Sequence, residues 1–254
     1  MKAYSLFSGS KGNCIFVVSD QACILIDCGV SERRTRCSIE ALGRKMGDID
    51  AIFITHEHSD HVSGLKIIEK KHSIPVHVTK QSARYIVSEE KDLQTMYLHD
   101  SESTVCVKDL EISSFELSHD SVCAVGYLVK DCRTGQTLGI ATDTGCITEG
   151  MKKKMCGCDA VVLESNHDTE MLKTGLYPPE LKIRIHGKNG HLSNDDAAEF
   201  ACFLSENGTK RIVLFHLSDE NNTRDKAIET VKNAINNDNV VVLAAEKSET
   251  VEIF

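Results

Sequence analysis

The sequence predicts a single α/β domain in which two β-sheets carry helices on their outer sides. Short apolar runs typical of strands recur from the N-terminus onward, and the last third of the chain alternates between helix-like and strand-like segments. No internal repeat, low-complexity tract or linker rich in Pro, Gly or Ser interrupts the 254 residues. We therefore expect one domain over residues 1–254.

The first half of the chain combines apolar strands with polar helices. Strands are predicted at Cys14–Val18, Cys23–Asp27, Ala51–Thr55 and Val76–Val78. Helices are predicted near Ser31–Lys45, from Gly64 to Lys71, and after Lys80.

The second half contains more strands and two clear helices. Further strands are predicted around Leu110–Leu117, Ala124–Val129, Leu138–Ala141, Asp159–Leu163, Ile212–Phe215 and Val240–Ala244. Asn194–Glu206 is predicted to be an amphipathic helix because Ala197, Ala198, Phe200, Ala201 and Leu204 recur at helical spacing. Asp225–Asn236 is the second predicted helix.

Composition narrows the class of protein. The formal net charge is −9, so the chain lacks the general basic character of proteins that bind nucleic acid tightly and without specificity. No stretch has the ~18 consecutive apolar residues of a membrane span, and the N-terminus turns polar too early for a signal peptide. We expect a cytoplasmic protein with no membrane partner, whose eleven cysteines are mostly free thiols. No oligomeric state is predicted.

The strongest chemical signal follows the predicted strand Ala51–Thr55. The run His56-Glu57-His58-Ser59-Asp60-His61 concentrates three imidazoles and a carboxylate within six positions. A strand end followed by a tight loop can direct such side chains at one point, and imidazole with carboxylate suits zinc, iron or manganese. A solvated polar loop is the alternative, which this density of histidine disfavours.

The His-x-His-x-Asp-His pattern at a strand end resembles the defining motif of the metallo-β-lactamase superfamily. The resemblance implies a four-layered αββα sandwich, the metallo-β-lactamase fold. It also implies that His56 and His58 bind a first metal ion, and that Asp60 and His61 bind a second.

Three later residues match the remaining ligands of that superfamily in order. The resemblance implies that His119 completes the first metal site, Asp143 bridges the ions and His216 completes the second site. Two divalent ions about 3.5–4 Å apart share a bridging water and lower its pKa toward neutrality. Asp60 would orient the resulting hydroxide or accept its proton. Zinc is the preferred metal, with manganese or iron as alternatives.

The C-terminal half resembles the nuclease branch of the superfamily. Glu164, Gly190-His191-Leu192-Ser193 and His216-Leu217-Ser218 follow the order found in ribonuclease Z, although the long arm that grips tRNA is missing. The resemblance gives His191 a catalytic role, stabilising the leaving oxygen or donating its proton. The alternative is a residue that only precedes the following helix.

Nearly the whole chain resembles the YycJ/WalJ-like proteins, a group associated with exonuclease activity on DNA. The resemblance is carried by Ser8-Gly9-Ser10-Lys11-Gly12-Asn13, Tyr177-Pro178-Pro179-Glu180-Leu181-Lys182, Gly190-His191-Leu192-Ser193-Asn194 and the Asn221-Asn222 pair. Candidate substrate contacts are Ser8, Asn13, Arg184, Lys188 and Asn222. Each has a plain structural alternative, a glycine-rich turn for Ser8 and Asn13 and a solvated charged surface for Arg184 and Lys188.

These observations favour a two-metal phosphodiesterase, most simply a nuclease acting on DNA. A hydrolase of a small phosphodiester or thioester is the alternative, which the low overall basicity favours. A non-catalytic regulatory binder is a third reading, which the complete set of seven candidate ligands disfavours.

Overall fold

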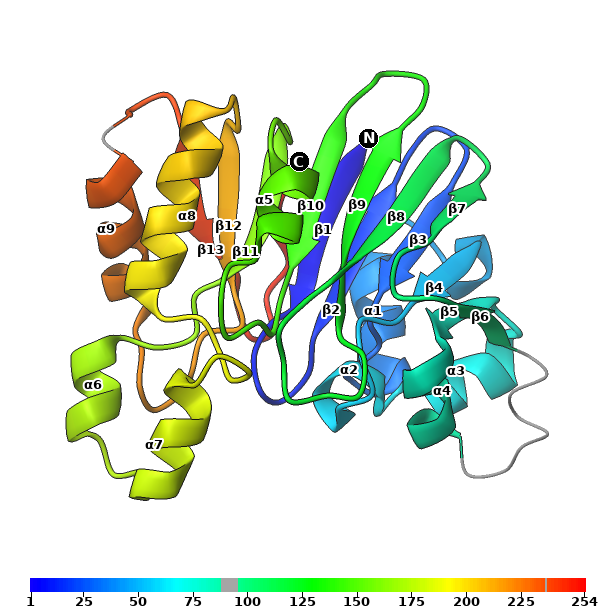
Figure 1. The fold of residues 1–254 in the computed structure, drawn as a ribbon. Helices are drawn as coiled ribbons and strands as arrows, with labels where there is room; N and C mark the ends of the chain where they lie inside the picture. The colour runs from blue at the N-terminus through cyan, green and yellow to red at the C-terminus, as the bar shows by residue number, and fades with distance from the viewer. Residues whose placement is uncertain (88–95, 236) are drawn as a thin grey trace.

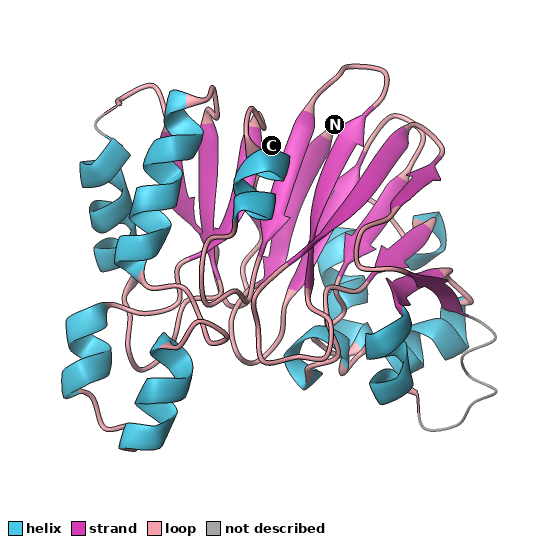
Figure 2. Ribbon diagram, in the orientation of Figure 1, coloured by secondary structure: helices cyan, strands magenta, loops and turns pink. Residues whose placement is uncertain are grey.

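The structure is a computed structural model that describes residues 1–87, 96–235 and 237–254. Its described strands form two sheets of seven strands each, which pack face to face with helices on both outer sides (Figures 1 and 2). This is the αββα sandwich that the sequence predicted, so the predicted fold class is confirmed.

The first sheet has the strand order β14-β1-β2-β3-β4-β5-β6. Its strands are β1 (Lys2–Phe7), β2 (Cys14–Val18), β3 (Cys23–Ile26), β4 (Ala51–Phe53), β5 (Val76–Thr79), β6 (Met96–His99) and β14 (Val251–Glu252). Strands β3 to β6 are parallel to one another, whereas β1 pairs antiparallel with β2 and β14.

The second sheet has the strand order β13-β12-β11-β10-β9-β8-β7. Its strands are β7 (Thr104–Val107), β8 (Leu110–Glu116), β9 (Val125–Asp131), β10 (Thr137–Ala141), β11 (Ala160–Glu164), β12 (Arg211–Phe215) and β13 (Val241–Ala244). Strands β10 to β13 are parallel, and β8 runs in the same direction because it is antiparallel to β9, which is antiparallel to β10.

The helices differ in how much they bury. The described helices are α1 (Glu32–Ala41), η1 (Met46–Asp48), α2 (Ser59–Val62), α3 (Leu65–His72), α4 (Lys80–Ile86), α5 (Glu149–Met155), α6 (Thr169–Thr174), α7 (Pro179–His186), α8 (Asn194–Glu206) and α9 (Arg224–Ile235). α8 buries six residues, while α7 buries none. None of the helices within the described ranges has the length and hydrophobicity that a bilayer-spanning segment needs.

Three apolar clusters account for the four layers. The central cluster joins both sheets, for example through Phe53 of β4 and Ile140 of β10. A second cluster lies between the second sheet and helices α5, α8 and α9, and a third lies between the first sheet and helices α1, α3 and α4. Burial of apolar surface on three successive interfaces holds the sandwich together.

Most predicted elements occur with shifts at their ends. The predicted β2 and α8 have the observed bounds, but the helix expected over Ser31–Lys45 ends at Ala41, where the chain turns and forms η1. The strand expected to reach Thr55 ends at Phe53. The helix expected to end at Asn236 is described only to Ile235, since residue 236 lies outside the described residues.

Candidate metal centre

The loop after β4 holds the first four candidate ligands in a fixed shape. His56 follows the strand, His58 precedes the one-turn helix α2, and Asp60 and His61 lie within that helix. Backbone hydrogen bonds connect α2 to the loops before β2 and after β3. The Asn13 amide donates to the Asp60 carbonyl oxygen, and the Cys28 amide donates to the His61 carbonyl oxygen, both at 2.8 Å. The loop is therefore positioned by the first sheet.

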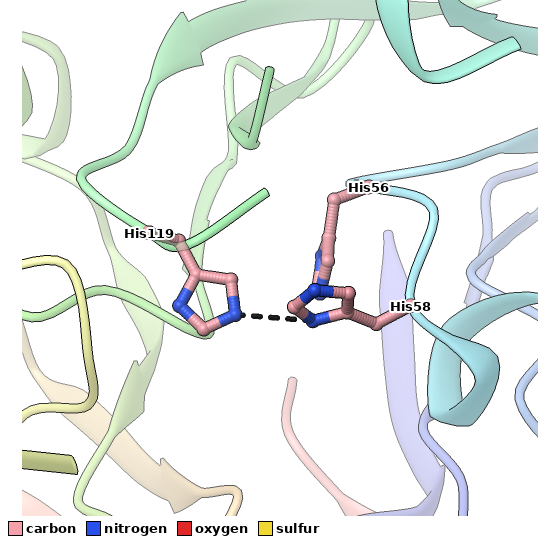
Figure 3. Close-up of side chains that lie close together, drawn as sticks. All are labelled: His56, His58 and His119. Carbon is pink, nitrogen blue, oxygen red and sulfur yellow. Dashed lines mark hydrogen bonds between the residues drawn. The ribbon is translucent and has the colours of Figure 1, made fainter. Parts of the chain in front are cut away.

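A first cluster of donor atoms joins three histidines. The donor atoms of His56, His58 and His119 all lie within 4.8 Å of one another. Figure 3 shows the three rings pointing toward one another, with His119 Nε2 3.3 Å from His58 Nδ1. His119 is placed by the loop after β8, and its Nδ1 lies 2.9 Å from the Gly190 carbonyl oxygen, which leaves Nε2 directed into the cluster.

A second cluster joins Asp60, His61, Asp143 and His216, whose donor atoms also lie within 4.8 Å of one another. His61 Nε2 is 3.1 Å from Asp143 Oδ2, and His216 Nε2 is 3.3 Å from Asp60 Oδ2. The two clusters adjoin, because the ring centroids of His56 and His61 are only 4.1 Å apart.

The structure thus brings together all seven predicted metal ligands from four segments of the chain, namely residues 56–61, His119, Asp143 and His216. Two buried atoms indicate that cations fit this place. His56 Nε2 and Asp143 Oδ2 make no hydrogen bond to a described residue, although Asp143 Oδ2 lies within ion-pair distance of His61 Nε2. A buried polar atom without a partner is costly unless something else satisfies it. Imidazole nitrogens and carboxylate oxygens are also the donors that zinc, manganese and iron accept in proteins.

Carboxylates behind the cluster orient its imidazoles. Asp27 Oδ2 lies 2.7 Å from His61 Nδ1, and the same carboxylate accepts hydrogen bonds from the Thr55 amide and hydroxyl. Glu164, which is fully buried, lies 3.0 Å from His216 Nδ1. Such contacts fix the tautomer and ring orientation of a metal-binding histidine.

The sequence analysis missed these supporting roles. Asp27 stood at the end of a predicted strand and Glu164 in a family motif, but nothing in the sequence paired them with histidines 34 and 52 positions away. A carboxylate that directly follows a buried strand was the available signal.

His191 lies beside the second cluster and belongs to neither of the two clusters of predicted metal ligands. Its Nδ1 is 2.7 Å from Glu164 Oε1, and its ring centroid is 5.1 Å from those of His119 and His216. Asp143, Glu164, His191 and His216 form a further group of donors within 4.8 Å of one another. His191 is 22% exposed at its side chain, so it faces both the cluster and the solvent-accessible side of the site.

Burial lowers the pKa values of the histidines in the site, whereas nearby carboxylates raise them. Burial lowers the pKa of His56 well below its ordinary value, and the nearby His61 lowers it further. Burial also opposes the charged form of His61 and His216, but the Asp143 carboxylate outweighs it, raising the pKa of His61 well above its ordinary value and that of His216 to about 10. Metal ions that bind such a cluster displace its protons.

Three residues of the site adopt a left-handed backbone. Asp27, Asp143 and His216 have φ values of 63°, 49° and 56°, although none is glycine. This conformation costs roughly 1–3 kcal/mol for each residue and persists where the surrounding structure imposes it. Each of the three follows directly or nearly directly after a strand, where the turn directs its side chain across the sheet edge.

The five predicted substrate residues fall into two groups. Ser8, Asn13 and Asn222 are buried and make hydrogen bonds inside the protein: Ser8 Oγ accepts from the His216 amide, Asn13 Nδ2 donates to Asp60 Oδ2, and Asn222 Nδ2 donates to Asn194 Oδ1. These bonds help to position the site, and the contact of these three residues with substrate stays a prediction. Arg184 and Lys188 are exposed.

A pocket of about 190 Å³ adjoins the centre. Its lining includes His191 and His216 together with Tyr177 from the loop before α7 and with Leu181 and Ile185 of α7. Arg184 also lines the pocket, and its Nε donates to Asp120 Oδ2 at 2.5 Å.

Known proteins share both the sequence and the fold. A sequence profile described as "Beta-lactamase superfamily domain" matches residues 23–217. Exodeoxyribonuclease YycJ of Bacillus anthracis is 34% identical over 224 residues, covering 87% of this chain and 84% of that protein. Exodeoxyribonuclease WalJ of Streptococcus pneumoniae is 34% identical over 235 residues, covering 91% and 86%. The metallo-beta-lactamase fold protein YhfI from Bacillus subtilis superposes with a TM-score of 0.73 at 14% identity, over 99% of this chain and 98% of that one.

Proposed function

The chain belongs to the beta-lactamase superfamily, within the family of YycJ and WalJ, and on that premise we propose that it is a metal-dependent exonuclease that hydrolyses phosphodiester bonds in DNA. The observation that carries the proposal is the pair of adjoining clusters of possible metal-ligand atoms, two of which are buried and make no hydrogen bond to a described residue. His56, His58 and His119 would hold one divalent ion, and Asp60, His61, Asp143 and His216 would hold the second.

Zinc is the favoured metal, with manganese and iron as alternatives, because the donors are imidazole and carboxylate without thiolate. When bound, two such ions supply a nucleophilic hydroxide at neutral pH and neutralise the charge that develops on the phosphate.

Asp60 would orient the attacking water or accept its proton. Its Oδ2 accepts a hydrogen bond from Asn13 Nδ2 at 3.1 Å and lies 3.3 Å from His216 Nε2, so the carboxylate is held in one orientation. Neighbouring imidazoles overcome the effect of burial and keep the pKa of Asp60 below its ordinary value. Asp60 therefore stays ionised and can accept a hydrogen bond from water.

His191 would act at the leaving oxygen. Burial opposes its charged form, but the Glu164 carboxylate raises the pKa of His191 above its ordinary value. A protonated imidazole at neutral pH can donate a proton to the departing oxygen. Glu164 itself is a positioning residue, because it touches His191 and His216 and is shielded from the pocket by complete burial.

DNA as the substrate is supported by the two exodeoxyribonucleases at 34% identity. The chain as a whole is acidic, but the exposed cation Arg184 lines the pocket, and exposed Lys188 follows it four residues later in the chain. Phosphate contacts from such side chains position nucleic acid without reading its sequence. A cytoplasmic location remains a prediction.

The test compares four substrates. Metal-loaded protein is incubated with single-stranded DNA, duplex DNA, RNA and bis-p-nitrophenyl phosphate, beside an Asp60→Ala/His61→Ala double variant and a His72→Ala control. His72 is a suitable control because it pairs with Glu32 outside the centre.

DNA cleavage that is lost in the double variant and kept in the control supports the proposal. Turnover of the small ester with DNA intact would instead assign the chain to small phosphodiesters. If no substrate is turned over with any of the three metals, the proposed activity is wrong and the chain is a non-catalytic binding protein.

A further inference from the structure

Each of the five histidines predicted to bind metal ions has a second ring nitrogen. A histidine that binds a metal through one nitrogen almost always donates its other N–H to a carboxylate, a carbonyl oxygen or water. In four of the five rings, that nitrogen has a protein partner. The partners are Thr55 Oγ1 for His56 at 3.0 Å, Asp27 Oδ2 for His61 at 2.7 Å, the Gly190 carbonyl oxygen for His119 at 2.9 Å and Glu164 Oε1 for His216 at 3.0 Å. The fifth ring is that of His58.

His58 has an unpaired Nε2 beside a carboxylate. Its Nδ1 faces the first cluster, because it lies 3.3 Å from His119 Nε2, as the dashed line in Figure 3 shows. Its Nε2 makes no hydrogen bond to a described residue, but Asp120 Oδ1 lies 4.0 Å away, close enough for an ion pair and too far for a hydrogen bond. The His58 side chain is 31% exposed, so the partner of Nε2 is either Asp120 or water.

Asp120 reaches both His58 and His119 through one oxygen. Its Oδ1 also lies 3.3 Å from His119 Nε2, although Asp120 is not a member of the three-histidine cluster. The Gly190 carbonyl oxygen beside His119 Nδ1 can only accept, so the ring proton is on Nδ1 and the Nε2 lone pair is available to a cation. Since Nε2 then has no proton for Asp120, Oδ1 can accept one from His58 Nε2.

The other oxygen of Asp120 is held by α7. Three consecutive residues of the loop after β8 contact the segment that runs from the end of α7 to the residue before His191. The contacts are Ser118 Oγ donating to the Lys188 carbonyl oxygen at 2.9 Å, His119 Nδ1 to the Gly190 carbonyl oxygen at 2.9 Å, and Arg184 Nε donating to Asp120 Oδ2 at 2.5 Å. The carboxylate is therefore anchored on one side and has Oδ1 free on the other.

We propose that Asp120 is the positioning residue for His58, accepting a hydrogen bond from His58 Nε2 when the first metal site is filled, with Arg184 holding the carboxylate in place. The inference rests on the metal centre of the proposed function. It adds a partner for the one predicted ligand histidine that has none among the described residues. Asp120 thereby does for His58 what Asp27 does for His61.

The test measures each metal site by itself and without nucleic acid, so substrate contacts of Arg184 do not enter. His216→Ala should keep the first site, and His119→Ala should keep the second. Zinc is titrated calorimetrically into metal-free protein of each background in competition with a chelator, with and without Asp120→Ala.

Asp120→Ala is expected to weaken zinc binding about 10- to 100-fold at the first site, the usual cost of losing a partner behind a metal ligand. The second site should be unchanged, which also shows that the variant is folded. Asp100→Ala is the matched control and should change neither site, because Asp100 is an exposed carboxylate that pairs with Lys80.

Asp120→Asn separates orientation from the mere presence of a side chain. Its amide has one oxygen and one NH₂ group, so either Arg184 or His58 faces a donor, and the first-site affinity should fall nearly as far as in Asp120→Ala. Adding Arg184→Ala frees the amide oxygen for His58. The Asp120→Asn/Arg184→Ala protein should therefore bind zinc several-fold more tightly than Asp120→Asn alone.

Three results overturn the inference alone. Unchanged first-site affinity in Asp120→Ala would leave water as the partner of His58. An equal loss at both sites would show a general effect on folding. An Asp120→Asn variant that Arg184→Ala does not improve would show that the carboxylate acts through its charge alone. If His216→Ala binds no zinc with Asp120 intact, the metal centre of the proposed function is wrong instead, so the two failures are distinct.

Discussion

Asp27 determines which nitrogen His61 presents to the metal centre. Its Oδ2 lies 2.7 Å from His61 Nδ1, which leaves Nε2 facing Asp60 and Asp143. Thr55 donates to the same carboxylate through both its amide and its hydroxyl. Both oxygens of Asp27 therefore accept hydrogen bonds, so an amide NH₂ group in place of either oxygen would face a hydrogen-bond donor.

Asp27→Asn places an amide NH₂ where the carboxylate accepts hydrogen bonds from Thr55 and His61. We expect the affinity for the second metal ion to fall about 10- to 100-fold, the usual cost of losing a partner behind a metal ligand. Calorimetric titration of metal-free protein measures it. Asp20→Asn is the matched control, since Asp20 is exposed and pairs with Arg133. Equal affinities in the two variants would contradict the role of Asp27.

The burial of His77 should make the folded protein less stable in acid. It stacks on Phe53 at 4.6 Å between ring centroids, and its Nδ1 lies 2.9 Å from His99 Nε2. Burial, assisted by His99, lowers the pKa of His77 to about 4. The unfolded chain, with a histidine pKa near ~6.5, binds more protons than the folded protein between those values.

Stability should therefore fall as the pH is lowered from about 6.5 to about 4, with His77 contributing roughly 1–2 kcal/mol after allowance for solvent screening. His77→Asn keeps a polar atom near the Nδ1 position but does not titrate, so the loss with acid should be smaller by that amount. Urea unfolding of chelated protein at pH 7, 6 and 5 tests this. Parallel curves for the two proteins would show that His77 is not responsible.

At the scale of secondary structure, the centre depends on strands that run in one direction. β3, β4, β8, β10, β11 and β12 all end at the same edge of the sandwich, and each is followed closely by a residue of the site or of its support. Residues far apart in sequence meet there because the carboxyl ends of parallel strands lie side by side.

Gly29 allows the chain after β3 to pass close beneath the helix α2. A Cβ at this position would lie 1.6 Å from the Asp60 carbonyl oxygen, a backbone atom that cannot move aside. Gly29→Ala should therefore destabilise the fold by about 3 kcal/mol and lower the metal content, because α2 carries two ligands. Gly47 has open space around its Cα, so Gly47→Ala should stay within about 0.5 kcal/mol of wild type. Thermal unfolding with metal analysis compares them, and similar behaviour of the two variants would refute the tight packing.

The spacing of apolar residues in the sequence predicted the helices and strands that pack on the core, and it missed those that do not. Asn194–Glu206 repeats apolar residues at helical spacing, and Cys14–Val18 is a continuous buried strand, so both were predicted with the observed bounds. The edge strands β6 and β7 are half exposed, and α7 directs Leu181 and Ile185 at a pocket instead of the core. Their patterns therefore lack the core signal.

The site shows the same division. His56, His58, Asp60 and His61 lie close together in sequence and could be predicted as candidate ligands, and family order selected His119, Asp143 and His216 as the other candidates. The supports could not be predicted, because the pairing of Asp27 with His61 and of Glu164 with His216 depends on how the strand ends turn. The burial of Ser8, Asn13 and Asn222, which we predicted to contact substrate, could not be read from the sequence either.

Over the whole molecule, an acidic chain gathers six of its eleven histidines, His56, His58, His61, His119, His191 and His216, at one edge between two sheets. The net charge is −9, so the proposed DNA substrate would have to be attracted by metal ions in the centre and by local side chains such as Arg184 and Lys188. All eleven cysteines are free, and no thiolate belongs to the donor clusters found among the described residues. The proposed metal centre would therefore consist of imidazole and carboxylate ligands alone.

The most direct measurement is the metal content of protein purified without added metal, determined by mass spectrometry for wild type, His119→Ala and His216→Ala. The account predicts about two ions for each wild-type chain and about one in each variant, because the two histidines belong to different clusters. Less than one ion in the wild type, or an unchanged count in both variants, would contradict a two-metal centre built from these side chains.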